Sequence, residues 1–397
     1  MLTTFYILIL AQICLGVISL LDGVLWLRMI RKRLRTHAGF YAPRVALLCP
    51  CKGLESGLEE NLSSLLRFDY ADYEVVFILA SALDPARQVI ERVMAANQRS
   101  ARLVIAEPPK DCGEKVINLR KAIDTLGDQV EVIVFTDSDV RPGRSWLAHL
   151  VAPLAETRIG ATTTFRWLFP AKGGFASALA SAWNAAIVTL LGDHSRNFCW
   201  GGGTAIRRKV FEEIHALDSW QGAVSDDFAL TRALHAANLA IHFVPECLAS
   251  TAFDASFREL LAFTDRQIII TRVYSPRHWA AGLISHVSYA ATLLFGVWVV
   301  LAEILAGEAW LGLAILWLLV PLLAAMKGTL RMAAVGEILP EWRTQIAKWS
   351  WAWTALAPLV PFLYAWNTLA ASVRREIRWR GVRYRLISAN ETRVLSR

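Results

Sequence analysis

Two pairs of aspartates in this chain have the spacing of residues that could hold a metal ion or accept a proton. Asp137 and Asp139 stand one residue apart, directly after the apolar run 130–135. Carboxylate oxygens suit Mg²⁺ and Mn²⁺, and a cation held there would offset the charge of a departing diphosphate. An Asp-Ser-Asp turn can also cap a helix or bind water, so its place after a strand is what favours a metal site.

The second pair, Asp226 and Asp227, precedes a helical pattern of Phe228, Leu230 and Leu234. One of the two carboxylates can serve as a helix N-cap, but a cap does not need both. Their like charge and partial burial would raise the pKa of one of them, which suits it to take a proton from an alcohol. We predict that Asp227 is the general base and that Asp226 is its supporting neighbour.

Alternating strand and helix patterns from residue 44 to about 256 predict an α/β domain with a mostly parallel sheet. Ligands of such sheets bind outside the carboxyl ends of the strands. The expected strands are 44–49, 73–80, 101–106 and 130–135, and the expected helices lie near 54–66, 85–96 and 114–126. The candidate binding residues in the segments that follow these strands are Pro50, Lys52, Asp84, Lys115, Asp137 and Asp139.

Three consecutive glycines, Gly201 to Gly203, lie between Trp200 and Thr204. Glycine lets a backbone approach another group closely. The segment is either a flexible loop or the floor of an acceptor site.

The first 27 residues predict an uncleaved membrane anchor. They carry a single charge, Asp22, and are long enough to cross the hydrocarbon layer of about 30 Å as a helix. Basic residues cluster at 28–35, after the apolar run, which predicts that residue 28 onward faces the cytoplasm. A secretory signal would carry its positive charges before the run.

A C-terminal membrane region is predicted at 281–372, with apolar runs at 281–304, 311–326 and 349–372. Ten of the sixteen tryptophans lie at or after Trp279, many near the run ends, as in an interfacial aromatic belt. A buried helical core is the alternative. The third run contains Pro358 and Pro361.

The number of predicted membrane spans and the charge of the last segment predict opposite sides of the membrane for that segment. Three full spans would leave residues 373–397 outside, yet these carry six arginines between 374 and 385, which favour a basic cytoplasmic tail. One resolution is that 349–372 is re-entrant and turns at its prolines, which requires protein or a cavity to cover the turn. The net charge of +8 comes mostly from such juxtamembrane arginines, which attract anionic headgroups, so nucleic acid is not the expected partner.

Residues 257–279 mix apolar and arginine residues and predict an amphipathic helix in the membrane interface. This helix could also present Arg266, Gln267 or Arg272 to a diphosphate. The six cysteines show neither zinc-site nor extracellular disulfide spacing, so we expect reduced packing residues.

These motifs resemble the membrane-anchored glycosyltransferases of families 2 and 21, in particular ceramide glucosyltransferases and bacterial hopanoid-associated glycosyltransferases. The resemblance covers most of the chain and implies a GT-A fold. It also implies a nucleotide site at Asp84, a metal-diphosphate site at Asp137 and Asp139, and a base at Asp227. The segment from Gly113 to Leu119 is similar to the family's Lys-x-x-Asn-Leu stretch.

One family element departs from the pattern. In the family's Gln/Arg-x-x-Arg-Trp motif, Gln267 matches, but Ile270 and Thr271 stand at the Arg and Trp positions. Arg272 and Tyr274 could substitute from a shifted register.

The sequence thus leads us to expect an inverting, metal-dependent transfer of a hexose, glucose before others, from a UDP-sugar to a lipid hydroxyl such as that of ceramide. The expected cofactor is Mg²⁺ or Mn²⁺, and the expected partners are the UDP-sugar donor and a membrane lipid acceptor. We expect a multi-pass membrane protein, as in a bacterial inner membrane, with its catalytic domain in the cytoplasm. The alternatives are transfer to polyprenyl phosphate, processive polysaccharide synthesis, and a non-catalytic lipid-binding membrane protein.

Overall fold

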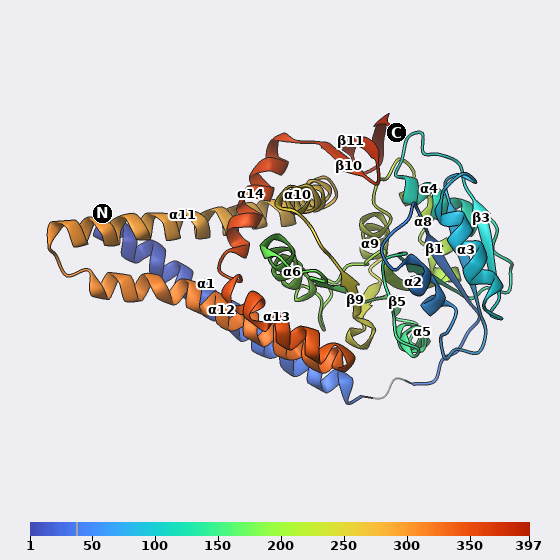
Figure 1. The fold of residues 1–397 in the computed structure, drawn as a ribbon, viewed down its shortest axis with the longest axis horizontal. Helices are drawn as coiled ribbons and strands as arrows, with labels where there is room; N and C mark the ends of the chain where they lie inside the picture. The colour runs from blue at the N-terminus through green and yellow to red at the C-terminus, as the bar shows by residue number, and fades with distance from the viewer. Residues whose placement is uncertain (37–38) are drawn as a thin grey trace. The chain divides into compact units, whose positions relative to one another are not determined.

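The computed structural model describes residues 1–36 and 39–397, which form two compact units (Figure 1). The sheet unit contains residues 33–167, 190–251 and 375–397, and the helical unit contains residues 1–32, 168–189 and 252–374. The sheet unit therefore combines segments from both halves of the chain.

A seven-stranded sheet in the order β3-β2-β1-β4-β7-β5-β8 forms the centre of the sheet unit. Strands β1 to β4 run parallel to one another, β7 is antiparallel to both β4 and β5, and β8 is parallel to β5. The mostly parallel sheet predicted from the sequence is confirmed. Its strands are β1 (Val45–Pro50), β2 (Tyr73–Leu79), β3 (Ala101–Ile105), β4 (Val132–Thr136), β5 (Ile159–Thr163), β7 (Gly203–Arg207) and β8 (Ala240–Phe243).

The helices of this unit follow the strands, as expected of α/β connections. Those with expected counterparts agree within a few residues of the sequence-based bounds. The helices of the sheet unit are α2 (Leu58–Leu65), α3 (Ala86–Ala95), α4 (Glu114–Ile123), α5 (Trp146–Val151), α7 (Arg208–Glu213), α8 (Ala216–Ser219) and α9 (Asp226–Ala236).

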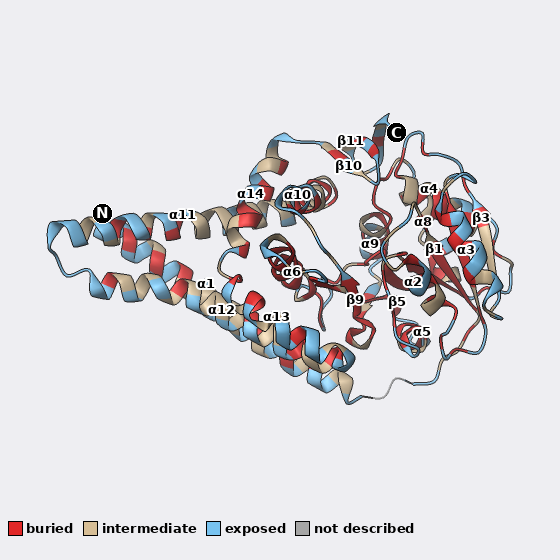
Figure 2. Cartoon of the chain, in the orientation of Figure 1, coloured by how far each residue is buried: buried red, intermediate tan, exposed pale blue. Residues whose placement is uncertain are grey.

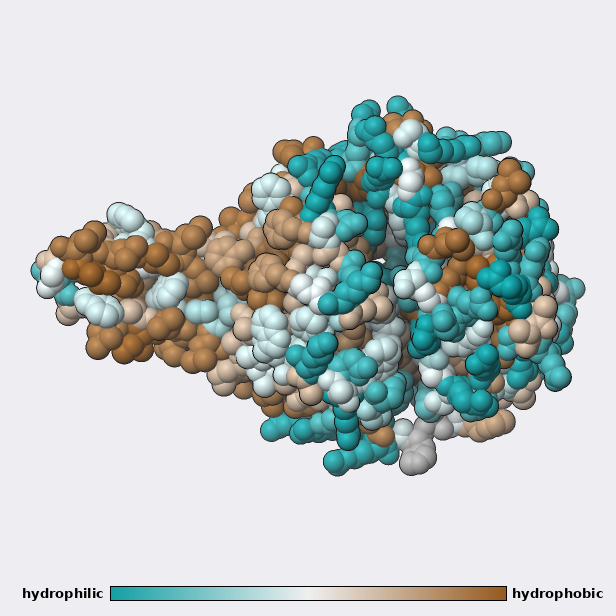
Figure 3. Space-filling model, viewed as in Figure 1, coloured by the Kyte–Doolittle hydropathy of each residue, from teal (hydrophilic) through white to brown (hydrophobic). Residues whose placement is uncertain are grey.

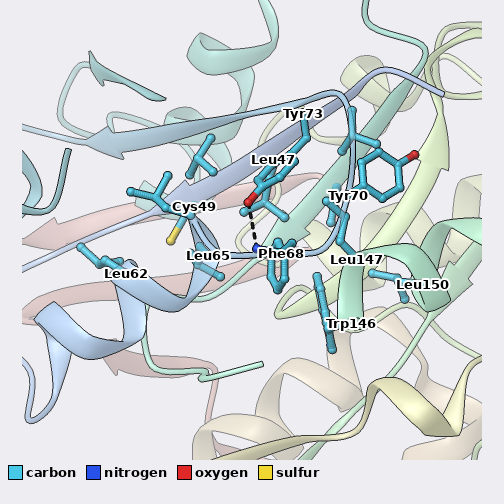
Figure 4. Close-up of a cluster of buried hydrophobic side chains, with 14 of the residues drawn as sticks. Leu47, Cys49, Leu62, Leu65, Phe68, Tyr70, Tyr73, Trp146, Leu147 and Leu150 are labelled. Carbon is cyan, nitrogen blue, oxygen red and sulfur yellow. Dashed lines mark hydrogen bonds between the residues drawn. The ribbon is translucent and has the colours of Figure 1, made fainter. Parts of the chain in front are cut away.

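The core of the sheet unit explains why the strand runs are almost continuously apolar. Parallel strands covered on both faces bury successive side chains, and every residue of β4 is buried. The sheet around the label β1 is largely red in Figure 2. One core cluster packs side chains of β1 and β2 against α2 and α5 (Figure 4). There the Phe68 ring stacks on Trp146 with 5.6 Å between centroids, and the Phe68 amide donates to the Tyr73 hydroxyl at 3.0 Å. This packing fixes the strand whose end carries the Asp137 motif.

The segment 373–397, expected as a basic tail, instead contains a three-stranded antiparallel sheet. Its strands are β10 (Glu376–Trp379), β11 (Val382–Ser388) and β12 (Glu391–Ser396). The buried residues Val382, Tyr384 and Leu386 alternate with exposed arginines along β11. The arginines dominate the composition and conceal this period-two pattern, which is that of a half-buried strand. The Glu114 amide donates to the Tyr384 hydroxyl at 3.2 Å, so the sheet is part of the sheet unit.

The helical unit contains three helices long and apolar enough to cross a membrane, α1 (Leu2–Leu34), α11 (Pro276–Ala306) and α12 (Leu311–Ile338). Their surfaces are largely hydrophobic in Figure 3. A further apolar pair, residues 340–355 and 360–373, bends by 70° at its break. The break lies at the prolines that the sequence marked as a turn. The shorter helices are α6 (Phe175–Val188), α13 (Arg343–Ala355) and α14 (Val360–Val373).

The stretch expected as an interfacial helix at 257–279 is divided at Ser275. Helix α10 (Phe257–Tyr274) starts with a capping box of Ser256 and Glu259, and Pro276 begins α11. Within the helical unit α10 packs on α14, where Asp265 accepts from Asn367 at 2.8 Å and pairs with Arg374 at 3.0 Å. Much of its apolar face is therefore buried against protein.

The C-terminal sheet gives a test of its packing. Leu386 is fully buried, so Leu386→Ala should lower the free energy of unfolding of the sheet unit by about 2–5 kcal/mol. Leu395 is 40% exposed in the same sheet, and Leu395→Ala should leave stability nearly unchanged. Thermal unfolding of the purified full-length chain in detergent measures both. Equal effects of the two substitutions would contradict the packing.

Candidate active site

One lysine joins the two acidic motifs. Asp137 follows β4, Lys115 lies in the first turn of α4, and Asp226 begins α9. The Lys115 ammonium is 2.7 Å from Asp137 Oδ1 and 3.4 Å from Asp226 Oδ2, and it donates to the Gly201 carbonyl at 3.0 Å. The two motifs predicted separately from the sequence therefore share one cation.

Burial and mutual charge shift the pKa values of the groups in this cluster. Burial raises the pKa of Asp226 to about 7, with Lys115 opposing the shift and Asp227 and Asp137 adding to it. Burial alone also raises the pKa of Asp137, but the Lys115 ammonium outweighs it and leaves that pKa below its ordinary value. Burial lowers the pKa of Lys115, yet the surrounding carboxylates raise it further, so the ammonium stays charged. Lys115 thus stabilises negative charge on Asp137 first.

The glycines at 201–203 are explained by close packing around this cluster. A Cβ at Gly201 would lie 2.5 Å from the Lys115 ammonium and 2.6 Å from Asp226 Oδ2. A Cβ at Gly202 would lie 2.7 Å from Asp137 Oδ2 and would clash with the ring of Trp200. The sequence left two interpretations of these glycines, a flexible loop and the floor of an acceptor site. Close packing leaves no room for a side chain, so a flexible loop is not needed to explain the glycines.

Asp139 has a different environment from Asp137. Its Oδ2 is 3.3 Å from the Arg166 guanidinium, while its Oδ1 is buried and has no hydrogen-bond partner among residues 1–36 and 39–397. Burial raises the pKa of Asp139, Arg166 opposes this shift, and Asp137 adds to it. Between the two aspartates, the Ser138 hydroxyl donates to Glu55 Oε2 at 3.0 Å.

Asp227 lies beside the Lys115 cluster and is less buried than Asp226. The Ser225 hydroxyl and the Phe228 amide donate to its Oδ1, the latter at 2.8 Å, and the Gly201 amide donates to its Oδ2 at 3.3 Å. The raised pKa expected for one member of the pair falls on Asp226, because Asp226 is the buried member. Among the described residues, the hydrogen bond to Asp227 Oδ2 is the long one from the Gly201 amide.

The residues expected to bind the nucleotide lie at the ends of β1 and β2, which are adjacent parallel strands. Pro50 ends β1, and Lys52 in the following loop pairs with Glu114 at 2.8 Å. Asp84 Oδ1 accepts from the Gly53 amide and from the Ala86 amide, each at 2.9 Å. Asp84 therefore ties the β1 loop to the first turn of α3.

The chain matches the sequence model of glycosyl transferase family 21 over residues 4–392. It belongs to this family. Among solved structures it is similar to the mannosyltransferase PcManGT from Pyrobaculum calidifontis, solved with GDP-Man and Mn²⁺. The two are 18% identical with a TM-score of 0.50, and the match covers 92% of this chain and 98% of that one. This likeness shows a common GT-A fold.

A second similar structure is glucosyl-3-phosphoglycerate synthase from Mycobacterium tuberculosis, solved with phosphoglyceric acid. It is 18% identical with a TM-score of 0.38, and the match covers 58% of this chain and 80% of that chain.

In this glycosyltransferase the acidic residues fit a cation shared with the donor. Over residues 1–36 and 39–397, no group of three or more His, Cys, Asp or Glu residues is arranged to hold a metal ion. Mg²⁺ is commonly bound by one or two carboxylates, with substrate phosphates and water completing the shell. Asp137 and Asp139 supply that number, and the unpartnered Asp139 Oδ1 is a suitable ligand atom.

Three site residues of the glycosyltransferase were not identified from its sequence. They are Glu55 in the β1 loop, Arg166 in β6 (Arg166–Phe169), and Arg380 in the turn between β10 and β11, which pairs with Glu55 at 2.5 Å. Glu55 could have been suspected from its place in the loop after β1. Neither arginine belongs to a recognisable motif, because each reaches the site through tertiary structure.

Three predicted donor contacts lie in the helical unit on α10. Arg272 donates to the Ala371 carbonyl at 2.5 Å and lies 5.3 Å from the centroid of the Trp279 ring, and Arg266 lies 5.5 Å from that of Phe263. Gln267 belongs to the same helix. Their contact with the donor stays a prediction.

The packing around Gly202 predicts a sensitive position. Gly202→Ala would push a Cβ against Asp137 and Trp200, so we expect a loss of stability of about 1–3 kcal/mol and a strong loss of sugar transfer. Gly143→Ala is the control, because a Cβ there would meet no atom within 4 Å. Thermal unfolding and sugar transfer are measured for both variants. Activity of Gly202→Ala equal to that of Gly143→Ala would contradict the geometry.

Proposed function

We propose that this glycosyltransferase moves a hexose, glucose before others, from a UDP-sugar to the hydroxyl of a membrane lipid such as ceramide, with inversion at the anomeric carbon. The observation that carries the proposal is the convergence of both aspartate motifs on Lys115 in one site. Family membership supports sugar transfer, and the three long apolar helices support a lipid acceptor.

The donor end of the site is the acidic pair after β4. Asp137 and Asp139 would hold Mg²⁺ or Mn²⁺, which supplies the positive charge that makes a diphosphate a good leaving group. Lys115 keeps Asp137 ionised and in place, and Arg166 pairs with Asp139 and opposes the rise in its pKa that burial causes. The presence of GDP-Man and Mn²⁺ in PcManGT, which has the same fold, is consistent with this assignment.

The β1 loop with Pro50 and Lys52, together with Asp84, would bind the nucleotide. Asp84 holds this loop through the Gly53 amide, so the loop and the start of α3 move together. A rigid floor of this kind reduces the ordering cost of binding.

Asp227 is assigned the role of base because its neighbour Asp226 already pairs with Lys115. Asp226 is buried and its Oδ2 faces Lys115, so it positions the lysine. Asp227 is more accessible, and the hydrogen bond from the Gly201 amide orients its carboxylate. In the reaction Asp227 takes the hydroxyl proton, and the acceptor oxygen forms a bond to the anomeric carbon. The bond from that carbon to the diphosphate oxygen breaks, and UDP leaves with the electron pair.

The chain segments that form the sheet unit support one membrane topology. Residues 190–251, which precede α10 and α11 in the chain, and residues 375–397, which follow α14, both belong to this unit, where Arg380 pairs with Glu55 and Tyr384 accepts from the Glu114 amide. A single compact unit lies on one side of a bilayer, so the chain between 252 and 375 crosses it an even number of times. If α11 and α12 each cross, the bent pair at 340–373 does not, which supports the re-entrant interpretation. The basic cluster at 28–35 supports a cytoplasmic location for the sheet unit.

The role of Asp227 is tested by Asp227→Asn in the full-length protein. The amide cannot accept the hydroxyl proton, so transfer of radiolabelled glucose from UDP-glucose into ceramide should fall by about 100-fold or more. UDP binding with Mn²⁺ should be retained. Asp218→Asn is the control at an exposed aspartate of α8. Turnover of Asp227→Asn like that of the wild type would remove Asp227 from this role.

The topology is tested by protease protection in inside-out membrane vesicles. A C-terminal tag should be cut without detergent because it follows the sheet unit, whereas an N-terminal tag should be cut only after detergent is added. Full protection of the C-terminal tag would rule out the re-entrant interpretation.

A further inference from the structure

Arg380 occupies a backbone conformation that its side chain does not favour. It forms, with Gly381, the two-residue turn between β10 and β11, and their φ angles are +49° and +86°. Turns with two positive φ values favour Asn or Asp followed by Gly, because other side chains are strained there. Gly381 adopts its positive φ without strain, whereas Arg380 adopts its positive φ with strain. Strain of this kind persists where the surrounding structure enforces it, and it is common at functional sites.

The turn directs the Arg380 side chain at the β1 loop. Its guanidinium pairs with Glu55 Oε1 at 2.5 Å and donates to the Lys52 carbonyl at 3.3 Å. Glu55 accepts the Ser138 hydroxyl through its other oxygen at 3.0 Å. Arg380 is therefore separated from the Asp137-Ser138-Asp139 motif by one carboxylate.

The charge around Arg380 is mostly negative. Burial alone lowers the pKa of its guanidinium, but Glu55, Asp139 and Asp137 raise it above its ordinary value. About a third of the side chain, 37%, is exposed. A permanent cation thus lies beside the acidic pair and stays accessible to a ligand.

The C-terminal sheet holds the turn in this position through further contacts. The Glu114 amide donates to the Tyr384 hydroxyl, and the Arg397 guanidinium donates to the Pro109 carbonyl at 2.5 Å. The Asn390 carbonyl lies so close to Gly222 that no side chain would fit there. Arg380 is therefore fixed by a folded element and does not belong to a mobile tail.

We propose that Arg380 is a donor-binding residue of the site, whose guanidinium binds the diphosphate of a nucleoside diphosphate sugar beside Asp137 and Asp139. This inference rests on the proposed function. Guanidinium groups bind phosphate oxygens through paired charge-assisted hydrogen bonds, and Glu55 holds the group in place before the donor arrives. Asn or Gly would relax the turn but would supply no cation, which accounts for the presence of a strained arginine.

The experiment compares UDP and UMP binding by the full-length protein in detergent with Mn²⁺, using equilibrium dialysis of the radiolabelled nucleotides. Arg380→Asn should bind UDP roughly tenfold to a hundredfold more weakly, which is the usual effect of losing charged hydrogen bonds. Binding of UMP, which lacks the second phosphate, should change less. Because Asn suits the positive φ, the melting temperature should stay equal or rise. Arg380→Lys should recover part of the UDP affinity.

Arg393→Asn is the matched control. Arg393 lies in β12 of the same sheet and pairs only with Glu391, at 3.4 Å, in the part of the chain that the structure describes. Its replacement removes the same charge and should leave the affinity for both nucleotides unchanged.

Two results would overturn the inference alone. One is UDP affinity of Arg380→Asn within about twofold of a wild type that does bind UDP. The other is an equal loss of UDP and UMP affinity together with a lower melting temperature, which would indicate a structural role only. A wild-type protein that binds no UDP would instead contradict the proposed function, and this inference with it.

Discussion

The site depends on a single buried ammonium shared by two carboxylates. Without Lys115, Asp137 and Asp226 would place two carboxylates in a poorly solvated region without the ammonium that both of them contact. Unpaired buried charges are expensive, so the three groups are stable only together. They come from β4, α4 and α9, and their shared dependence holds the end of the sheet to two helices. The glycines at 201–203 supply the remaining requirement, which is room for the backbone to approach.

This dependence also separates the roles of the two aspartates in α9. A carboxylate that must balance Lys115 in the interior is constrained in position and in protonation. The carboxylate one residue later is less buried, and the proposed mechanism assigns it the exchange of a proton with the substrate. Under that proposal one helix start carries both a positioning group and a reactive group, because successive helix residues point about 100° apart.

Much of the sheet unit was predictable because its signals are local. The apolar runs of β1, β2 and β4 gave strand positions, and the carboxyl-end rule collected Pro50, Lys52, Asp84 and Asp137 at adjacent strand ends. The contact of Arg380 with the Lys52 carbonyl was not predictable, because it joins residues 328 positions apart in sequence. The C-terminal sheet was missed because six arginines in a short segment were interpreted as solvated charge. The shift of the raised pKa to Asp226 required knowledge of burial, which sequence does not supply.

The placement of residues 375–397 in the same unit as residues 33–167 has a consequence for biosynthesis. A ribosome makes the first strands of this sheet long before it makes Arg380 and Tyr384, and the candidate membrane helices α11 and α12 are made in between. The sheet unit therefore stays incomplete while those helices enter the bilayer. A polypeptide cut short between residues 228 and 375 would carry both aspartate motifs yet lack the C-terminal sheet, so translation has to pass residue 375 before the unit can mature.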